Sequence, residues 1–208
     1  MSRRAILVGV WLALIVNLSL AATPEDDPRK LVMTVTDSVL AKLREQRPEL
    51  AQDPERIFDL IEQDVLPHFD FVRISAWVLG KYWRRATREQ KLRFVRAFRT
   101  ILVRTYGTAL LEYTDQKIRY LPLRGDPASD DVTVRTEILN PGRTPTAINY
   151  RLHRRNGQWK VYDVTVDGVS LVANYRTAFA AEIRDKGLDA LIARLEAKAA
   201  RQSGGGGG

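Results

Sequence analysis

The spacing of apolar residues changes twice along this chain, and these changes restrict the possible folds strongly. From Leu31 to about Leu110, apolar residues recur at intervals of three and four, which indicates amphipathic helices. Between Ile118 and Val166 they alternate with polar residues, which indicates half-buried strands. Helical spacing returns after Gly168. Helices, then strands, then helices again predict an α+β domain.

Local signals mark where the predicted helices begin and end. A first helix over residues 31–43 is expected to end before Pro48. Asp53-Pro54 is typical of the cap and first position of a second helix. Thr87-Arg88-Glu89-Gln90 has the threonine and glutamine of a capping box, and the longest predicted helix follows it.

Four strands are expected between the helical regions. They cover residues 118–120, 132–138, 148–152 and 159–166, and Asn156-Gly157 is a strong signal for a two-residue hairpin between the last two. The sequence therefore predicts a helical layer packed on a curved, mainly antiparallel four-stranded sheet, with an apolar pocket between the layers.

The N-terminal residues are typical of a targeting segment. Two arginines precede an apolar run over residues 5–16, and Ser19-Leu20-Ala21 fits a small-residue cleavage site. The run is shorter than the roughly 20 residues that a membrane-spanning helix needs. We therefore expect a signal peptide over residues 1–21, one exported domain over residues 22–202 and a flexible glycine tail over residues 203–208.

Composition excludes several classes of function. The chain has no cysteine, which rules out disulfides, cysteine catalysis and cysteine metal sites. Its formal net charge is +8. Nucleic acid is the usual partner of a basic chain, but export argues against it. A membrane surface or an acidic protein is a better counterpart, and the charge could also serve solubility alone.

Few residues are candidates for catalysis. His68 lies near Asp70 and could be an acid–base residue, although a helix start near the surface explains it better. His153 lies on the polar phase of a strand, which predicts exposure to solvent. Asp163 has apolar neighbours and could act as a buried base, but we favour a structural pairing. Ser170 lacks the glycine of a nucleophile elbow, so helix capping is the better interpretation.

A basic run with aromatic residues precedes and enters the longest predicted helix. A solvated helix face is one explanation for it. The other is an amphipathic rim, since Tyr and Trp favour boundaries between water and apolar phases and cations bind lipid phosphates. The aromatic residues are Tyr82, Trp83 and Phe94, and the cations are Lys81, Arg84, Arg85, Arg88, Lys91, Arg93 and Arg96.

Four segments, in this order, carry a resemblance to a known family. They are Phe69-Asp70-Phe71; Leu79-Gly80-Lys81-Tyr82-Trp83-Arg84; Phe94-Val95-Arg96-Ala97-Phe98 leading to Tyr106; and Tyr162-Asp163-Val164 with Gly168-Val169-Ser170-Leu171 and Tyr175-Arg176. Together they resemble the MlaC family, the periplasmic phospholipid-binding proteins of the Mla (toluene-tolerance Ttg2-type) ABC transport system. The resemblance covers nearly the whole mature chain.

The resemblance implies a periplasmic phospholipid carrier that is not an enzyme and needs no cofactor or metal. Such a carrier shuttles phospholipid between an outer-membrane lipoprotein–porin complex and an inner-membrane ABC transporter with a lipid-binding ring, and so maintains outer-membrane lipid asymmetry. A monomer is expected, with no nucleic-acid partner. Two alternatives remain open at this point: an enzyme that uses Asp163 or His68 as a base in an apolar pocket, and an exported adaptor with a filled core.

The carrier hypothesis predicts a pocket lined by apolar side chains, because each buried methylene of an acyl chain contributes about 0.8 kcal/mol. A solid core would use the same residue types. Tyr82 and Trp83 are expected at the rim of the pocket. The predicted lipid-binding residues are Phe69, Ile74, Val78, Leu79, Tyr82, Trp83, Phe98, Leu102, Tyr106, Tyr150, Val161, Val164, Val169, Tyr175 and Phe179.

Overall fold

The computed structural model describes residues 27–112, 116–124, 129–140 and 142–204. The predicted signal peptide and residues 205–208 of the predicted tail lie outside the described residues. The last helix continues to Gly204, so the first two residues of the predicted tail are helical. None of the helices in the described part of the chain is both long and apolar enough to span a bilayer.

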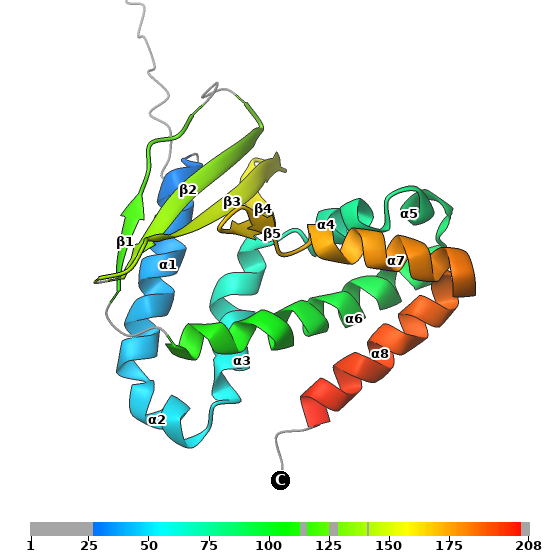
Figure 1. Cartoon of the computed structure of the whole chain (residues 1–208), viewed down its shortest axis with the longest axis horizontal. Helices are drawn as coiled ribbons and strands as arrows, with labels where there is room; N and C mark the ends of the chain where they lie inside the picture. The colour runs from blue at the N-terminus through cyan, green and yellow to red at the C-terminus, as the bar shows by residue number, and fades with distance from the viewer. Residues whose placement is uncertain (1–26, 113–115, 125–128, 141, 205–208) are drawn as a thin grey trace, which may run out of the picture.

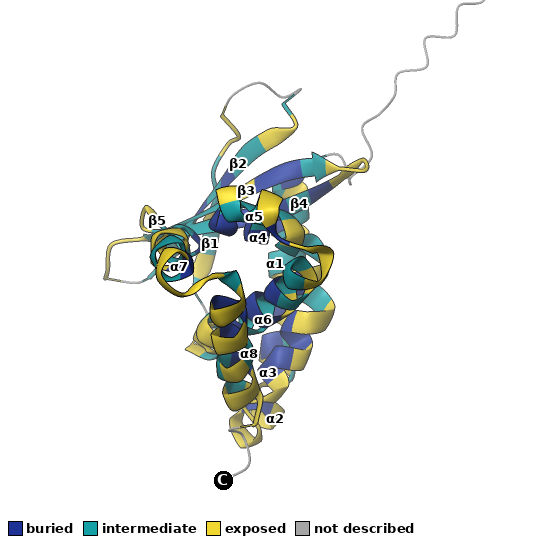
Figure 2. Ribbon diagram, turned by 90° about the vertical axis from the view of Figure 1, so that its right-hand side faces the viewer, coloured by how far each residue is buried: buried dark blue, intermediate teal, exposed yellow. Residues whose placement is uncertain are grey.

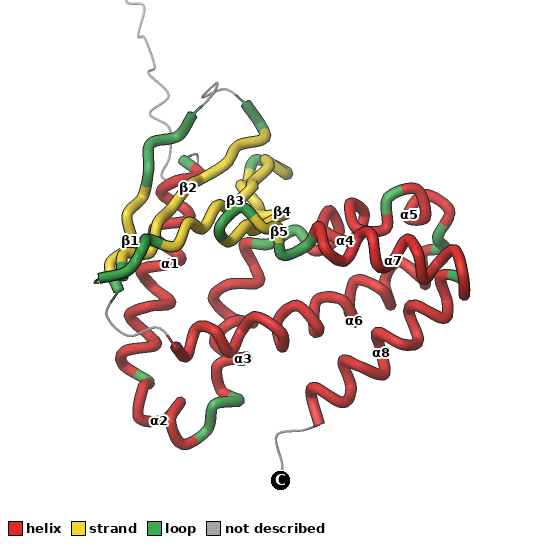
Figure 3. Tube along the Cα trace, viewed as in Figure 1, coloured by secondary structure: helices red, strands yellow, loops and turns green. Residues whose placement is uncertain are grey.

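Helices account for most of the described chain, and they lie largely on one side of the sheet (Figures 1 and 3). Before the sheet come α1 (Pro28–Glu45), α2 (Arg47–Gln52), α3 (Arg56–Leu60), the π-helical turn η2 (Ile61–Val65), the 3-10 turn η3 (Leu66–His68), α4 (Phe71–Leu79), α5 (Lys81–Arg85), α6 (Arg88–Tyr106) and the 3-10 helix η4 (Gly107–Glu112). After it come α7 (Ala173–Lys186) and α8 (Leu188–Gly204).

The sheet is antiparallel throughout, with its strands in the order β1-β2-β3-β4-β5. The four predicted strands are present, and a fifth strand of two residues follows Gly168. This strand is too short to show an alternating pattern. The strands are β1 (Lys117–Tyr120), β2 (Asp131–Leu139), β3 (Thr146–Arg155), β4 (Gln158–Val166) and β5 (Val169–Ser170).

Two local features shape the β3–β4 hairpin. Asn156 and Gly157 both have positive φ, at 50° and 77°, as the predicted two-residue turn requires. Farther along, Arg151 pairs with Asp163 while the next residue, Leu152, pairs with Val161. One extra residue of β4 is therefore accommodated in a β-bulge, which bends the strand and increases its twist.

The helix starts agree only partly with the sequence signals. The capping box at Thr87 is confirmed, because the Gln90 N–H donates to Thr87 Oγ1 at 3.1 Å and Gln90 Oε1 accepts from the Thr87 N–H at 2.9 Å. The predicted start at Asp53-Pro54 is wrong: Asp53 accepts from the N–H of Glu55, and α3 begins at Arg56. The predicted second helix is divided into α3 and the π-helical turn η2.

Buried apolar residues form three clusters instead of one continuous core. The largest joins α4, α6, α7 and α8, and the ring of Phe179 makes edge contacts with Phe94 at 5.9 Å and Phe98 at 5.5 Å. A second lies among α1, α2, α3 and η2, and a third lies between α1 and the sheet. Figure 2 shows the buried side of the helices turned inward. The space between these clusters holds the site described next.

Candidate functional site

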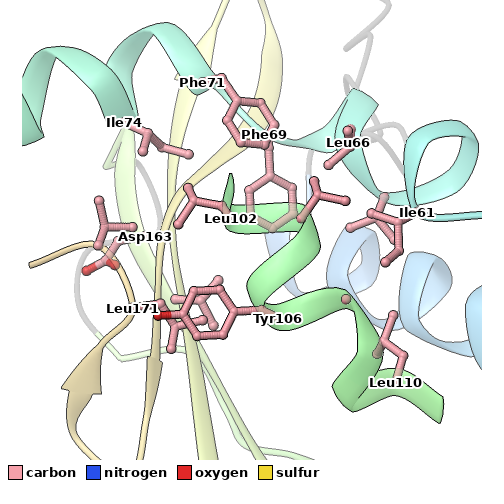
Figure 4. Close-up of a pocket in the computed structure, with 15 residues that line it drawn as sticks. Ile61, Leu66, Phe69, Phe71, Ile74, Leu102, Tyr106, Leu110, Asp163 and Leu171 are labelled. Carbon is pink, nitrogen blue, oxygen red and sulfur yellow. The ribbon is translucent and has the colours of Figure 1, made fainter. Parts of the chain in front are cut away.

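A first cavity of about 200 Å³ lies where η2, α4 and the end of α6 meet β4 (Figure 4). Among its lining residues only Tyr106 and Asp163 carry polar side-chain atoms, so its wall is almost wholly apolar. The lining residues are Ile61, Val65, Leu66, Phe69, Phe71, Ile74, Leu102, Val103, Tyr106, Gly107, Leu110, Asp163, Val164, Leu171 and Val172.

A second cavity of about 210 Å³ lies between α1 and the sheet. It is also mostly apolar, with polar atoms supplied by the side chains of Thr36, His68 and Tyr150. Burial, and then the charge of Lys160, lowers the pKa of His68, so the neutral imidazole is favoured in this wall. The lining residues are Leu31, Val32, Val35, Thr36, Val39, Leu40, Val65, His68, Phe69, Leu110, Tyr150 and Val161.

The two cavities adjoin each other, because Val65, Phe69 and Leu110 line both of them. We call these three residues the shared wall. Val65 comes from the π-helical turn, Leu110 from the 3-10 helix η4, and Phe69 from the junction between η3 and α4. Departures from regular α-helix of this kind are frequent at functional sites. The wall is thus built from irregular segments, not from the middle of long helices.

The position of Phe69 is fixed by its neighbour Asp70, which is only 5% exposed. Asp70 accepts hydrogen bonds from the N–H of Arg73 at 2.9 Å, from Arg155 Nη1 at 2.9 Å and from His153 Nε2 at 3.0 Å. Burial alone would favour the neutral acid. The bonds from Arg73 and Arg155, and then that from His153, outweigh it and lower the pKa of Asp70.

The prediction that His153 is exposed is wrong, since its exposed fraction is 8%. The N-terminus of α4 packs across this end of the sheet and brings Asp70 and Arg73 onto the imidazole. Arg73 Nη1 lies 3.1 Å from His153 Nδ1, and an arginine can only donate. His153 Nε2 lies 3.0 Å from Asp70 Oδ2, so the imidazole is held between Arg73 and Asp70.

The same end of the sheet holds a second polar group. The hydroxyl of Tyr162 donates to Asp131 at 2.7 Å, and the guanidinium of Arg73 lies 4.3 Å from the centre of the Tyr162 ring. Arg73 also pairs with Asp131 at 3.0 Å. These contacts join α4 to β2 and β4, so the segment that carries Phe69 is anchored to the sheet by side chains as well as by its backbone.

Asp163, in the wall of the first cavity, has a structural partner. Its Oδ1 accepts from the hydroxyl of Ser170 at 2.7 Å, and Ser170 Oγ in turn accepts from the N–H groups of Val172 and Ala173. The N-cap position of α7 is Val172, which makes no side-chain cap bond, so Ser170 is not the N-cap that the sequence suggested. Its hydroxyl, held by Asp163, nevertheless accepts from the N–H of Ala173, the first residue of the helix. This arrangement supports the structural interpretation of Asp163. No group of three or more potential metal ligands occurs in the described residues.

The structure separates the predicted lipid-binding residues into two groups. The first group lines neither cavity. It consists of four residues buried in the largest core cluster (Val78, Leu79, Phe98 and Phe179), three packed against that cluster (Tyr82, Trp83 and Tyr175), and Val169, which is 56% exposed. The other predicted residues lie in cavity walls. They are Ile74, Leu102, Tyr106 and Val164 in the first cavity, Tyr150 and Val161 in the second, and Phe69 in both.

Sequence reasoning missed the contributions of α1, of η2 and of η4 to the cavity walls. The predicted lipid-binding residues include none from these three segments, although their side chains line the cavities. The sequence offered one signal: the predicted helices carry more apolar surface than one small sheet can cover. The spacing of apolar residues does not show which of these helix faces lines a cavity.

Comparisons with known proteins agree with one another. A family model described as "MlaC protein" matches residues 33–197. The "Intermembrane phospholipid transport system binding protein MlaC" of Haemophilus influenzae is 25% identical over 183 residues, which is 86% of each chain. The "Toluene tolerance protein ttg2D" of Pseudomonas putida is 29% identical over 179 residues, 86% of this chain and 83% of its own length.

A solved structure is also similar. It is described as the phospholipid-binding protein from Ralstonia solanacearum in complex with a phospholipid. It is 31% identical to this chain, with a TM-score of 0.78, and the match covers 85% of this chain and 99% of that one. The likeness therefore extends over nearly all of the related protein.

Proposed function

The chain belongs to the MlaC family, and on that premise we propose that it is a periplasmic carrier that binds phospholipid in its two apolar cavities. The observation that carries the proposal is the pair of adjoining cavities with a shared wall. Two neighbouring apolar compartments suit a ligand with two acyl chains. Each methylene removed from water contributes about 0.8 kcal/mol, so binding does not require specific hydrogen bonds.

We infer that the protein moves lipid between an outer-membrane lipoprotein–porin complex and an inner-membrane ABC transporter with a lipid-binding ring. The name of the relative from Haemophilus influenzae supports a role in transport, and a signal peptide over residues 1–21 would deliver the protein to the periplasm. Of the two bases considered for an enzyme, Asp163 is engaged by the Ser170 hydroxyl, and His68 lies in the wall of the second cavity, which supports a role for both in building the walls. Cargo binding accounts for the apolar walls without any chemistry.

Native mass spectrometry of the protein isolated without detergent tests the binding. We expect a mass excess that corresponds to bound phospholipid and that is released as intact lipid on denaturation. Leu102→Trp and Val164→Trp each place an indole in the first cavity and should reduce lipid content several-fold while the chain still folds. Leu92→Trp is the control, because Leu92 is 49% exposed on the same helix as Leu102.

The contrary outcomes point to the other two functions. A clean apo mass, with no lipid uptake from vesicles, would favour the adaptor with its basic surface. Turnover of a hydrophobic substrate that is lost in Asp163→Asn, with ligand binding retained, would favour the enzyme. Unchanged lipid content in both tryptophan variants would contradict the assignment of the first cavity as the lipid site.

A further inference from the structure

Cations gather around half-buried aromatic rings at the end of the molecule formed by α4, α5, α7 and the start of α6. Figure 1 places α5 at this end, and Figure 2 shows the mostly exposed α5 facing the viewer. Within the described part of the chain, none of these cations forms an ion pair with a carboxylate. We call the group the basic tip, and its cations are Lys81, Arg84, Arg85, Arg88, Lys91 and Arg176.

The aromatic rings of the basic tip join the core to the surface. Trp77, Tyr82 and Trp83 are partly buried and pack against the largest core cluster. A cation lies over each ring: Lys91 Nζ is 5.3 Å from the centre of Trp83, Lys81 Nζ is 5.3 Å from that of Tyr82, and the Arg176 guanidinium is 5.4 Å from that of Trp77. Each ring is therefore apolar toward the core and carries a positive charge toward the solvent.

The positive charge of the basic tip contrasts with the rest of α6. One to four turns farther along this helix, Arg93 pairs with Glu196 at 2.7 Å, Arg99 pairs with Glu62 at 2.7 Å, and Arg104 pairs with Glu55. Arg96 is the one arginine of α6 beyond the tip for which the described residues supply no ion pair. The six cations of the tip outnumber Glu89, the carboxylate of that stretch, so this end carries a net positive charge and a local positive field.

We propose that the basic tip docks on the anionic surface of a phospholipid bilayer. Tyrosine and tryptophan are enriched at the boundary between membrane and water, and lysine and arginine are attracted to anionic headgroups. The headgroups of a fluid leaflet can rearrange around a cation. A bilayer can therefore bind side chains that no ion pair holds in one position. This docking does not depend on the cavities, so it stands or falls separately from the carrier function.

Vesicle cosedimentation of the purified protein tests the proposal. We expect binding to vesicles that contain phosphatidylglycerol, weak binding to vesicles of phosphatidylcholine alone, and loss of binding as salt screens the charges. Each cation near an anionic surface strengthens binding by about fivefold. Replacing Arg84, Arg85 and Arg88 together by glutamine should therefore weaken binding on the order of 100-fold.

The matched control replaces Lys117, Arg124 and Arg143 by glutamine, which removes the same charge from exposed positions on β1 and on the connections beside the sheet. The control should bind vesicles nearly as well as the unaltered chain. Equal loss in both variants would mean that only net charge matters and would overturn the proposal. If the unaltered chain does not bind the anionic vesicles, the proposal is also overturned. This holds even if the basic tip is then found to bind an acidic protein. Phospholipid in the isolated protein, measured on the same samples, reports on the carrier function independently.

Discussion

Asp70 connects the start of α4 to β3 and β4. Its carboxylate accepts bonds from a helix N-terminus, a histidine and an arginine, and its own N–H donates to the carbonyl of Val161 at 2.9 Å. Phe69, one residue earlier, lies in the shared wall of the two cavities. The buried charge and the apolar wall are therefore parts of the same local structure.

Replacing Asp70 by asparagine should change the acid stability of the protein. The pKa of Asp70 is lowered in the folded state, so the unfolded chain binds a proton more readily. The stabilisation is complete above the unfolded pKa of about 4 and is lost as the pH falls through the lower folded pKa. Asp70→Asn should reduce the free energy of unfolding at pH 7 by roughly 1–3 kcal/mol and should remove this part of the pH dependence.

Urea unfolding followed between neutral and strongly acidic pH measures both effects. Asp185→Asn is the control, since Asp185 is exposed and its nearest cation is its neighbour Arg184. A stability profile of Asp70→Asn that runs parallel to the wild-type profile down to the lowest pH would show that Asp70 does not carry the linkage.

At the scale of elements, α6 serves two purposes along its length. Its first turns pack Phe94 and Phe98 into the largest core cluster, and its last turns supply Leu102 and Tyr106 to the first cavity. At Gly107 the helix changes to the 3-10 helix η4. A Cβ atom at Gly107 would lie 2.6 Å from Cδ1 of Ile61, so α6 and the π-helical turn approach each other as closely as a glycine permits.

Gly107→Ala should therefore shrink the first cavity. The new methyl group would displace the side chain of Ile61, which lines that cavity. Overpacking of this kind typically costs about 1–3 kcal/mol of stability, and lipid content measured by native mass spectrometry should fall. Adding Ile61→Val removes the clashing methyl and should restore both properties in part. If the double variant is no better than Gly107→Ala, the contact with Ile61 is not the cause.

The elements also differ in how far their sequence determines them. The capping box at Thr87 and the turn at Asn156-Gly157 were predicted correctly, because each depends on a few adjacent residues. Burial of His153 was not predicted, because it depends on α4 crossing the end of the sheet. The π-helical turn was not predicted either, since its side chains have the same apolar spacing as a continuous helix.

The same distinction applies to the cavity residues. Phe98 and Leu102 lie one helical turn apart on α6, yet Phe98 is fully buried in the core and Leu102 lines the first cavity. Both positions are apolar for the same reason, removal of side-chain surface from water. Whether the facing volume is filled by protein or left open depends on how α4, α6 and the sheet are spaced, and that spacing is a property of the assembled fold.

At the scale of the whole molecule, the first and second cavities lie among three separate clusters of buried residues in the described part of the chain. Bound lipid would complete the packing, so the lipid-loaded protein should be more stable than the delipidated one. By mass action, ligand at 100 times its Kd adds about 2.7 kcal/mol. Calorimetric melting of loaded and delipidated samples should show a higher Tm for the loaded form. The difference should nearly vanish in Leu102→Trp, and identical Tm values for the two unaltered samples would contradict the prediction.

The shared wall has a consequence for which lipids fit. Because Phe69 borders both cavities, a displacement of its side chain that enlarged one compartment would reduce the other. Coupling of this kind is reciprocal: what occupies one side changes the free energy of occupying its neighbour by the same amount in both directions. Two chains held here would therefore be selected jointly. A longer chain on one side would be matched by a shorter chain on the other, so that the protein responds to the sum of the two lengths rather than to either length alone.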